Sequence, residues 1–334
     1  MSKVAVVKGE DRAANLGKVL SLMDSDIKAA VNKKGSKILF IKVNAIDPKF
    51  PIAVTRPEAL DTVLEYFKKY NFSKIIVGDN SYTFTKFKDN NLYTDVLKKH
   101  GATPSNLTEF GTKDIKFRLI NEQSVTGRMT LLTDTAFSVS LALPKTHDTY
   151  VYTGCSKNGM GCLLTNRWSV HSITMAERLF INKYIHSNKY KNENLPKVVM
   201  ESKPDLAIMD AFIGMEGDGP IFGTEVQLGM ALCSLDTIAL DMVASKIIGS
   251  GDAEYLRLCK GIGETDIKKI EIIKDGFKSI EDVSMKFKRH YLHDYQVMDY
   301  HKKTLRFFDI KATIQIMLRF YRLKDKILER ISRA

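Results

Sequence analysis

The chain has 334 residues, and its shares of 44% hydrophobic and 27% charged residues are typical of a globular protein. The formal net charge is +12, but residues 285–334 contain 13 Lys and Arg against 5 Asp and Glu and so carry +8 of it. Because the other 284 residues carry only +4, the high overall charge does not by itself indicate a nucleic-acid-binding protein.

The cysteines and the apolar segments bear on the class of protein. The four cysteines are scattered and do not form a disulfide framework, and no signal peptide is recognisable at the start of the sequence. No apolar run is long enough for a transmembrane helix. We therefore expect a cytoplasmic protein with a core large enough to need no disulfide.

The first hundred residues alternate between predicted strands and predicted helices. Apolar runs predict strands over residues 4–7, 37–43 and 74–78, and helical spacing predicts helices over 15–31, 57–70 and 92–100. Pro57 suits the first position of its helix. This β-α-β-α-β order predicts a parallel sheet covered by helices.

The following residues continue the pattern up to residue 284. Strands are expected within 107–139, over 205–209 and 227–233, and within 260–276, and helices over 195–201, from an N-cap at Ser234 to Ile248, and over 253–259. We predict an α/β protein of parallel or mixed sheets covered by helices. Two lobes, at about 1–135 and 136–284, face a cleft, and a basic helical tail over 285–334 follows them.

The loop from Leu143 to His171 concentrates reactive side chains between a predicted strand and a helix-like segment. It contains Lys145, His147, Lys157 and several glycines. Ligands of α/β proteins bind in such loops, at the carboxyl ends of the strands. Histidine can bind a metal or transfer a proton, and a lysine with a lowered pKa can form covalent adducts. Ordinary residues of a Gly-rich turn are the alternative interpretation.

Two further segments place charged side chains beside the ends of predicted elements. Thr55 and Arg56 precede a helix N-terminus, where backbone N–H groups and a guanidinium suit phosphate or carboxylate. Asp210 enters a Gly-rich stretch over 209–223, which suits a general acid or base or a ligand of a hard cation. A surface arginine and a solvated surface turn are the alternatives. Neither common nucleotide-binding fingerprint is present.

Seven short motifs occur in an order that resembles the domain of unknown function 362 family over roughly residues 3–280. They are KVN (Lys42–Asn44), TRPE (Thr55–Glu58), LPKTH (Leu143–His147), KNGMG (Lys157–Gly161), His171, DAFIGMEGDGP (Asp210–Pro220) and SLDTIALD (Ser234–Asp241). Some members carry an added ferredoxin-like module. This chain lacks the closely spaced four-cysteine pattern, so no ferredoxin-type iron–sulfur cluster is expected.

A second, weaker resemblance is to the nickel-pincer lactate racemase family. It implies that Thr55 and Arg56 contact an adenylated cofactor, that Lys157 attaches to it, and that His147 transfers protons while His171 binds the metal. The complete set of candidates is His147, Lys157 and Asp210 for catalysis, Thr55, Arg56, Lys145, Lys157 and Asn158 for cofactor binding, and His171 for metal binding.

Three functions follow from these patterns. The first is a racemase- or epimerase-like enzyme that acts on a small organic acid with an adenylated or metal-containing cofactor. The second is a non-catalytic protein that binds a cofactor or an anion. The third is binding of the basic tail to an anionic membrane surface or to nucleic acid, of which nucleic acid is the least favoured because the tail contains no recognisable motif for it. The sequence does not predict an oligomeric state.

The tail has the pattern of an amphipathic helix from Met298 to Ile331. Its apolar face contains Leu305, Phe308, Ala312, Ile316, Phe320 and Leu323. Lys and Arg residues flank this face, so the helix either docks on its own domain or a partner protein, or lies on an anionic membrane.

Removal of the residues after Tyr300 separates these outcomes. If the helix docks on its own domain, truncation exposes apolar surface and lowers the melting temperature. If it is a membrane anchor, the truncated protein keeps its melting temperature and loses salt-sensitive binding to anionic vesicles. Thermal melting and vesicle binding of both chains measure these effects. Both outcomes are contradicted if the full-length chain does not bind vesicles and the truncated chain has the same melting temperature as the full-length chain.

Overall fold

The structure is a computed structural model that describes residues 1–80, 87–89, 91–118, 124–148, 150–164, 191–250, 253–260 and 269–290. The chain divides into two compact units, Met1–His293 and Asp294–Ala334, and every described residue belongs to the first. The predicted tail helix and His171 lie outside the described residues, so both stay predictions. Among the residues that are described, no helix is long and apolar enough to cross a membrane.

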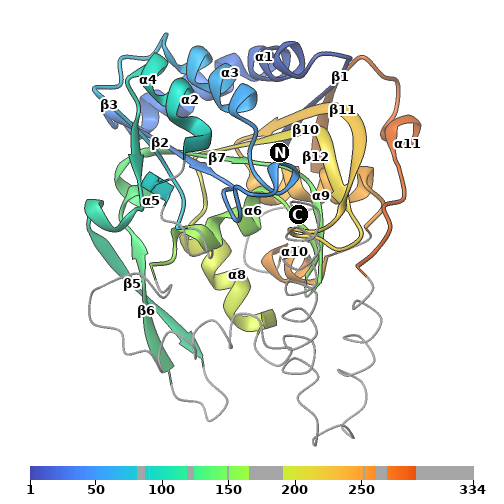
Figure 1. The fold of residues 1–334 in the computed structure, drawn as a ribbon. Coiled ribbons are helices and arrows are strands. Elements are labelled where there is room, and N and C mark those ends of the chain that lie inside the picture. Colours follow the sequence, from blue (N-terminus) through green and yellow to red (C-terminus); the bar gives the residue numbers. More distant parts are fainter. Residues whose placement is uncertain are drawn as a thin grey trace, which may run out of the picture. The chain divides into compact units, whose positions relative to one another are not determined.

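Ten strands of the described residues form one mainly parallel sheet (Figure 1). They are β1 (Ser2–Lys8), β2 (Ile38–Val43), β3 (Lys74–Gly78), β4 (Thr103–Ser105), β7 (Phe137–Ala142), β8 (Lys145–His147), β9 (Val151–Thr153), β10 (Leu206–Glu216), β11 (Thr224–Ser234) and β12 (Ile270–Asp275). The order is β12-β1-β11-β10-β7-β2-β3-β4, with β8 beside β10 and β9 beside β8. Both predicted lobes therefore contribute strands to a single sheet.

Strand direction brings the candidate residues to one edge. Strands β10, β7, β2, β3 and β4 are parallel to one another, and β1 is parallel to β12, whereas β11 is antiparallel to both β1 and β10. The carboxyl ends of β2, β3 and β7 consequently lie together. A separate two-stranded sheet pairs β5 (Thr112–Arg118) with β6 (Ser124–Thr130).

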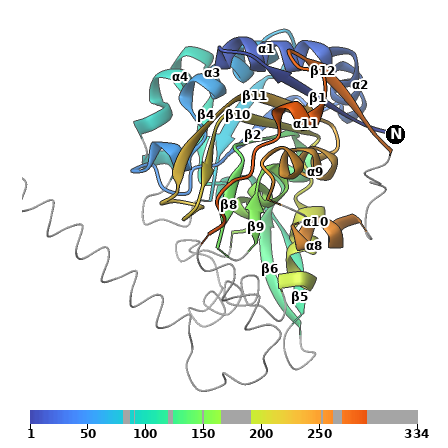
Figure 2. The same ribbon diagram turned by 90° about the vertical axis from the view of Figure 1, so that its right-hand side faces the viewer.

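Helices cover both faces of the large sheet (Figures 1 and 2). The longer ones are α1 (Arg12–Leu22), α2 (Asp24–Lys34), α3 (Pro57–Phe67), α4 (Thr94–His100), α8 (Lys191–Glu201), α9 (Thr237–Ile247) and α10 (Glu254–Lys260). Short helical turns include α5 (Leu132–Thr135), α6 (Cys155–Asn158), α11 (Ile280–Val283), η1 (Pro51–Ala53) and η5 (Gly159–Cys162). Helices α1 to α4 lie on one face, and α6, α8, α9 and α10 lie on the other. The α/β class and the helix-covered, mainly parallel sheet predicted from the sequence are confirmed.

The alternation of side chains along each strand determines on which face of the large sheet a side chain lies. In β2, Leu39, Ile41 and Val43 belong to the apolar cluster formed with α1 to α4. Phe40 packs in the cluster on the opposite face, so Lys42, two residues further on, lies on that same opposite face. The strand thus directs a lysine into the layer between the sheet and α6.

The helix expected over 15–31 is two helices, and that prediction was wrong. Met23 divides it, with a non-helical backbone at φ −103° and ψ 8°. Apolar spacing continues through the break because Met23 and Ile27 belong to the same apolar cluster. Asp24 and Asp26 occupy the first turn of α2, where acidic side chains favour a helix N-terminus.

Two details around β10 and α9 also differ from the sequence prediction. The Gly-rich stretch over 209–223 is β-strand as far as Glu216, and its pairing with β11 shifts register between Ala211 and Ile213. Gly214 lies inside that strand because the ring of Phe287 packs on it, and a Cβ there would lie 2.9 Å from the ring. The N-cap of α9 is Asp236 rather than Ser234, since the Asp236 side chain accepts the first free N–H groups of the helix.

A buried carboxylate fixes the turn that carries Lys157 and Asn158. Asp241 on α9 accepts hydrogen bonds from the backbone N–H groups of Cys155 (2.9 Å) and Ser156 (2.7 Å) and from the Tyr152 hydroxyl (3.0 Å). Burial raises the pKa of Asp241 to about 6. A Cβ at Gly154 would collide with this carboxylate, so glycine is required where α6 begins.

We expect Asp241→Asn to destabilise the protein by about 1–3 kcal/mol, because an amide NH₂ would face a buried N–H donor and leave it without an acceptor. Asp236→Asn on the same helix is the matched control, since asparagine is also a good N-cap. Urea unfolding of the two variants measures the difference. Equal free energies of unfolding would show that the Asp241 hydrogen bonds do not hold α6.

Candidate functional site

A cluster of buried and half-buried polar side chains lies at the carboxyl edge of β2, β3 and β7, and we call it the lysine cluster. Its members are Lys42, Asn44, Asp79, Lys145 and Asn158. Lys42 Nζ lies 2.7 Å from Asp79 Oδ1, and the two side chains are only 5% and 6% exposed. The same ammonium donates to Asn158 Oδ1 (3.0 Å) and to the Val43 carbonyl (2.7 Å). Lys42 is thus fully engaged as a paired buried charge.

Asn158 connects the parts of the lysine cluster. Its Nδ2 donates to the Lys42 carbonyl (2.9 Å) and to Ser140 Oγ (3.0 Å), while its Oδ1 accepts from Lys42 and, at 3.4 Å, from Asn44 Nδ2. Both ends of the amide are therefore occupied by protein groups. Asn158 thus links α6 to β2 and β7, and its predicted contact with a cofactor stays a prediction.

Lys145 is the most deeply buried ammonium of the cluster. Its Nζ donates to Asn44 Oδ1 (3.0 Å) and to the carbonyl of Ala53 in η1 (2.9 Å), and the residue is 1% exposed. Burial, together with the nearby Lys157 charge, lowers the pKa of Lys145 to about 7. A large share of the side chain is consequently a neutral amine near neutral pH.

His147 follows on the same short strand, β8, and is also buried. Its Nδ1 lies 2.7 Å from Asp148 Oδ1, and the Tyr150 N–H is directed at the same nitrogen from the longer distance of 3.4 Å. The shorter contact favours a proton on Nδ1, donated to Asp148, which places the lone pair of the neutral ring on Nε2. Burial and the Lys157 charge lower the pKa of His147 to about 4. The imidazole is therefore neutral near neutral pH.

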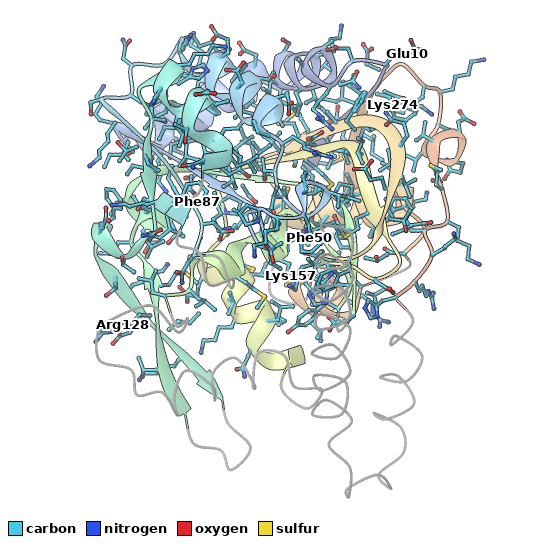
Figure 3. The ribbon with its side chains drawn as sticks, in the orientation of Figure 1. Glu10, Phe50, Phe87, Arg128, Lys157 and Lys274 are labelled. Carbon is cyan, nitrogen blue, oxygen red and sulfur yellow. The ribbon has the colours of Figure 1, made fainter. Side chains whose placement is uncertain are left out.

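Lys157 lies on α6 (Figure 3) and differs from the other two lysines. Its ammonium is 5.1 Å from the centroid of the Tyr150 ring, and within the described part of the chain it has no hydrogen bond or ion pair. The side chain is partly exposed. Burial lowers the pKa of Lys157 to about 8, although the charge of Asp148 opposes the shift.

Charge connects these groups. The Lys157 ammonium lowers the pKa of both Lys145 and His147, so all three lie within electrostatic reach of one another. Lys42 adds to the same effect on Lys145, and Asp79 opposes it. An anion bound here would relieve the repulsion among the ammonium groups. The arrangement therefore favours an anionic ligand.

The glycines of the KNGMG motif allow close packing over the cluster. A Cβ at Gly161 would collide with the Asp79 carboxylate and with the end of the Lys42 side chain. A Cβ at Gly159 would collide with the Ser202 hydroxyl. Glycine at both positions lets η5 approach the Lys42–Asp79 pair and exclude water from it.

Thr55 takes part in the scaffold of the site. Its hydroxyl donates to the Leu141 carbonyl (2.8 Å) and accepts the Asn44 N–H (2.8 Å), and the residue is buried. Its own carbonyl accepts from the Tyr93 hydroxyl (2.7 Å). Because the hydroxyl proton is already used, this side chain holds the end of β2 and does not offer a donor to an anion in this conformation.

Asp210 and Arg56 belong to a second group, the arginine cluster, formed with Arg12 and Glu225. Asp210 Oδ2 lies 3.3 Å from Arg12 Nε, and Arg56 Nη2 lies 3.1 Å from Glu225 Oε1. Burial raises the pKa of Asp210, while the charges of Arg12 and Arg56 oppose the rise. Along β10 the neighbouring even-numbered residue Ile208 packs with α1 to α4, so Asp210 points to the face opposite Lys42.

The structure therefore brings together Thr55, Lys145 and Asn158, places His147 and Lys157 beside them, and assigns Arg56 and Asp210 to the arginine cluster. Sequence reasoning gave no role to Lys42, Arg12 or Asp241. The available signal was a lysine inside the apolar run KILFIKV, since a charge at an inward strand position requires a partner.

A metal site is not formed by the described residues. Within them, no group of three or more His, Cys, Asp or Glu side chains is arranged to hold a metal ion. The predicted ligand His171 lies outside the described ranges, so its role stays a prediction. All four cysteines are free and buried.

Fold and site define an α/β protein with a polar, positively charged cluster at the carboxyl edge of a mainly parallel sheet. The sequence profile of a family described as "Domain of unknown function (DUF362)" matches residues 39–246, and the chain belongs to this family. The resemblance noted from the motifs is thereby confirmed, and the resemblance to lactate racemases stays a hypothesis.

No curated protein matches the chain. Among solved structures, it is similar to a protein from Thermotoga maritima, with a TM-score of 0.39 and 8% sequence identity. The similarity covers 75% of this chain and 59% of the length of that protein.

The lowered pKa of Lys145 predicts a pH-dependent contribution to stability. An unfolded lysine titrates near pH 10.4, whereas the pKa of the folded residue is about 7. Between these values the unfolded state binds more protons, so the free energy of unfolding rises with pH. Relative to Lys145→Met, the wild type should gain up to about 1.4 kcal/mol per pH unit from about pH 7 to 10.

Urea unfolding of both proteins from about pH 6 to 9.5 checks this expectation. Lys246→Met makes the same change at an exposed position of α9 and should show no comparable slope. A difference between wild type and Lys145→Met that stays constant with pH would show that Lys145 remains charged in the fold.

Proposed function

We propose that this protein is a racemase- or epimerase-like enzyme that acts on a small organic acid. The observation that carries the proposal is the position of Lys157, an ammonium without a described hydrogen bond that shifts the pKa of both Lys145 and His147. The lysines supply positive charge for a carboxylate, and His147 and Lys157 are two groups that can exchange protons with its α-carbon.

The two pKa values suit opposite roles at one pH. Inversion at an α-carbon requires removal of a proton by a base and return of a proton by an acid on the other face. With a pKa of about 4, His147 is a neutral base near neutral pH. With a pKa of about 8, Lys157 is mostly protonated and can act as the acid. Asp148 orients the imidazole by its hydrogen bond at Nδ1.

The racemase resemblance adds an adenylated or metal-containing cofactor to the proposal. When bound, such a group would stabilise the electron pair left at the α-carbon after its proton is removed. Arg56, Lys157 and His171 are the residues proposed to hold it. The Thr55 hydroxyl proton is already donated to the Leu141 carbonyl, so the Arg56 guanidinium is the donor that this loop offers to an anionic group. The proton-transfer roles of His147 and Lys157 rest on their pKa values and on the contact that both side chains make with the Tyr150 ring.

A non-catalytic anion-binding protein is the second candidate. The complete hydrogen bonding of Lys42 and Asn158 within the lysine cluster supports it, because groups that are already paired can form a rigid binding site without taking part in proton transfer. The two candidates differ in whether a bound acid exchanges its α-proton with solvent.

Incubation with chiral 2-hydroxy and 2-amino acids in deuterated water tests the proposal. The protein should be purified from its own host and examined by intact mass and elemental analysis, so that a cofactor is retained and recognised. We expect deuterium to appear at the α-carbon, which proton NMR measures. The exchange rate should fall about 100-fold or more in Lys157→Met and in His147→Asn. Lys197→Met, at an exposed site on α8, is the control.

The exchange rate should depend on pH in a defined way. It should rise as His147 loses its proton near pH 4 and fall as Lys157 loses its proton above about pH 8. Calorimetric binding of an acid without any exchange would support the non-catalytic candidate. Absence of both binding and exchange across the panel would refute both.

A further inference from the structure

Two aromatic rings on different loops form a contact near the lysine cluster. Phe50 follows β2, and Phe222 lies in the turn between β10 and β11. Their ring centroids are 5.0 Å apart and nearly perpendicular, an edge-to-face arrangement. Phe222 is 44% exposed, and within the described part of the chain it is the one aromatic residue among the large exposed apolar side chains. Part of the Phe222 ring is therefore open to solvent.

Both loops are anchored at β8, which carries Lys145. The Phe50 carbonyl accepts the N–H of Ala53 (2.8 Å), and the Ala53 carbonyl accepts Lys145 Nζ (2.9 Å). On the other loop, Gly217 accepts a hydrogen bond from the Thr146 hydroxyl (2.9 Å). Gly219 approaches Thr146 so closely that a Cβ there would collide with the Thr146 carbonyl. Each ring is thus connected to the immediate surroundings of Lys145 by a short, hydrogen-bonded path.

The turn that carries Phe222 is held on its outer side as well. The N–H of Gly217 donates to the Lys288 carbonyl (2.9 Å), and the N–H of Lys288 donates to Glu216 Oε2 (2.8 Å). The Phe222 N–H closes the turn on the Asp218 carbonyl (3.1 Å). Phe222 is consequently presented by a fixed backbone, so a contact made by its ring would require little ordering on binding.

We infer that Phe50 and Phe222 are specificity-determining residues that select an organic acid with an aromatic or similarly large apolar substituent, an inference that rests on the proposed binding of an organic acid. The ammonium groups of Lys145 and Lys157 attract the carboxylate, while the ring pair contacts the apolar part. Ligand sites of this kind combine a few placed charges with aromatic surface, and each part restricts a different portion of the ligand.

Lactate and 3-phenyllactate are the probes, because both are 2-hydroxy acids and they differ by the phenyl group. Calorimetric titration of the full-length protein should show binding of phenyllactate about ten-fold tighter than lactate. Phe222→Ala and Phe50→Ala should each weaken phenyllactate binding about three- to ten-fold and leave lactate binding within about two-fold. Leu258→Ala, which removes an exposed apolar side chain on α10, should change neither affinity.

The outcomes separate the two levels of inference. Binding of both acids with equal affinity, or a phenyllactate preference that survives both phenylalanine variants, overturns the role of the ring pair and leaves the proposed acid site intact. If neither acid binds, both the proposed acid site and the specificity role are overturned. Circular dichroism and melting of each variant confirm that a loss of affinity is not a loss of fold.

Discussion

The buried ion pair between Lys42 and Asp79 is the constraint around which the candidate site is arranged. A lysine at an inward position of a central strand cannot be solvated, so the fold must place a carboxylate and acceptors against it. Asp79 reaches it from the end of β3 and is itself fixed by the backbone N–H of Ala45 (2.8 Å), while Asn158 reaches it from α6. Such a pair contributes little net stability, but loss of one partner typically costs about 3–5 kcal/mol. The pair therefore determines the positions of β2, β3 and α6 around the site and adds little to the free energy of unfolding.

Local patterns predicted most of the fold, and they failed where distant contacts decide. Apolar runs identified β1, β2 and β3, and Pro57 marked the start of α3, because burial and backbone restriction act within a few residues. The break at Met23 escaped detection because both helices share one buried face. The length of β10 escaped detection because glycine normally weakens a strand. Here Phe287, far away in sequence, supplies the packing at Gly214 that the missing side chain cannot.

The same distinction explains which site residues sequence reasoning identified. Lys145, His147 and Lys157 are close in sequence, and strand β8 followed by α6 keeps them close in space. Asp210 was grouped with them because it follows a predicted strand, but alternation along β10 turns it to the opposite face. Asp241 escaped because its partners are backbone groups more than eighty residues away. A carboxylate inside a predicted helix gives no sign in the sequence that it is buried, because its hydrogen bonds form only when α9 packs against α6.

Electrostatic coupling within the site makes binding and protonation interdependent. A carboxylate placed beside Lys145 and Lys157 would raise the pKa of both, because a nearby negative charge favours the ammonium form. Lys145, with a pKa of about 7, would take up at most about half a proton near neutral pH, and Lys157 would become more fully protonated. His147 would shift in the same direction, yet from a pKa of about 4 it would remain neutral. The bound anion would thereby favour opposite protonation states, because the lysines become protonated acids while the histidine stays a neutral base.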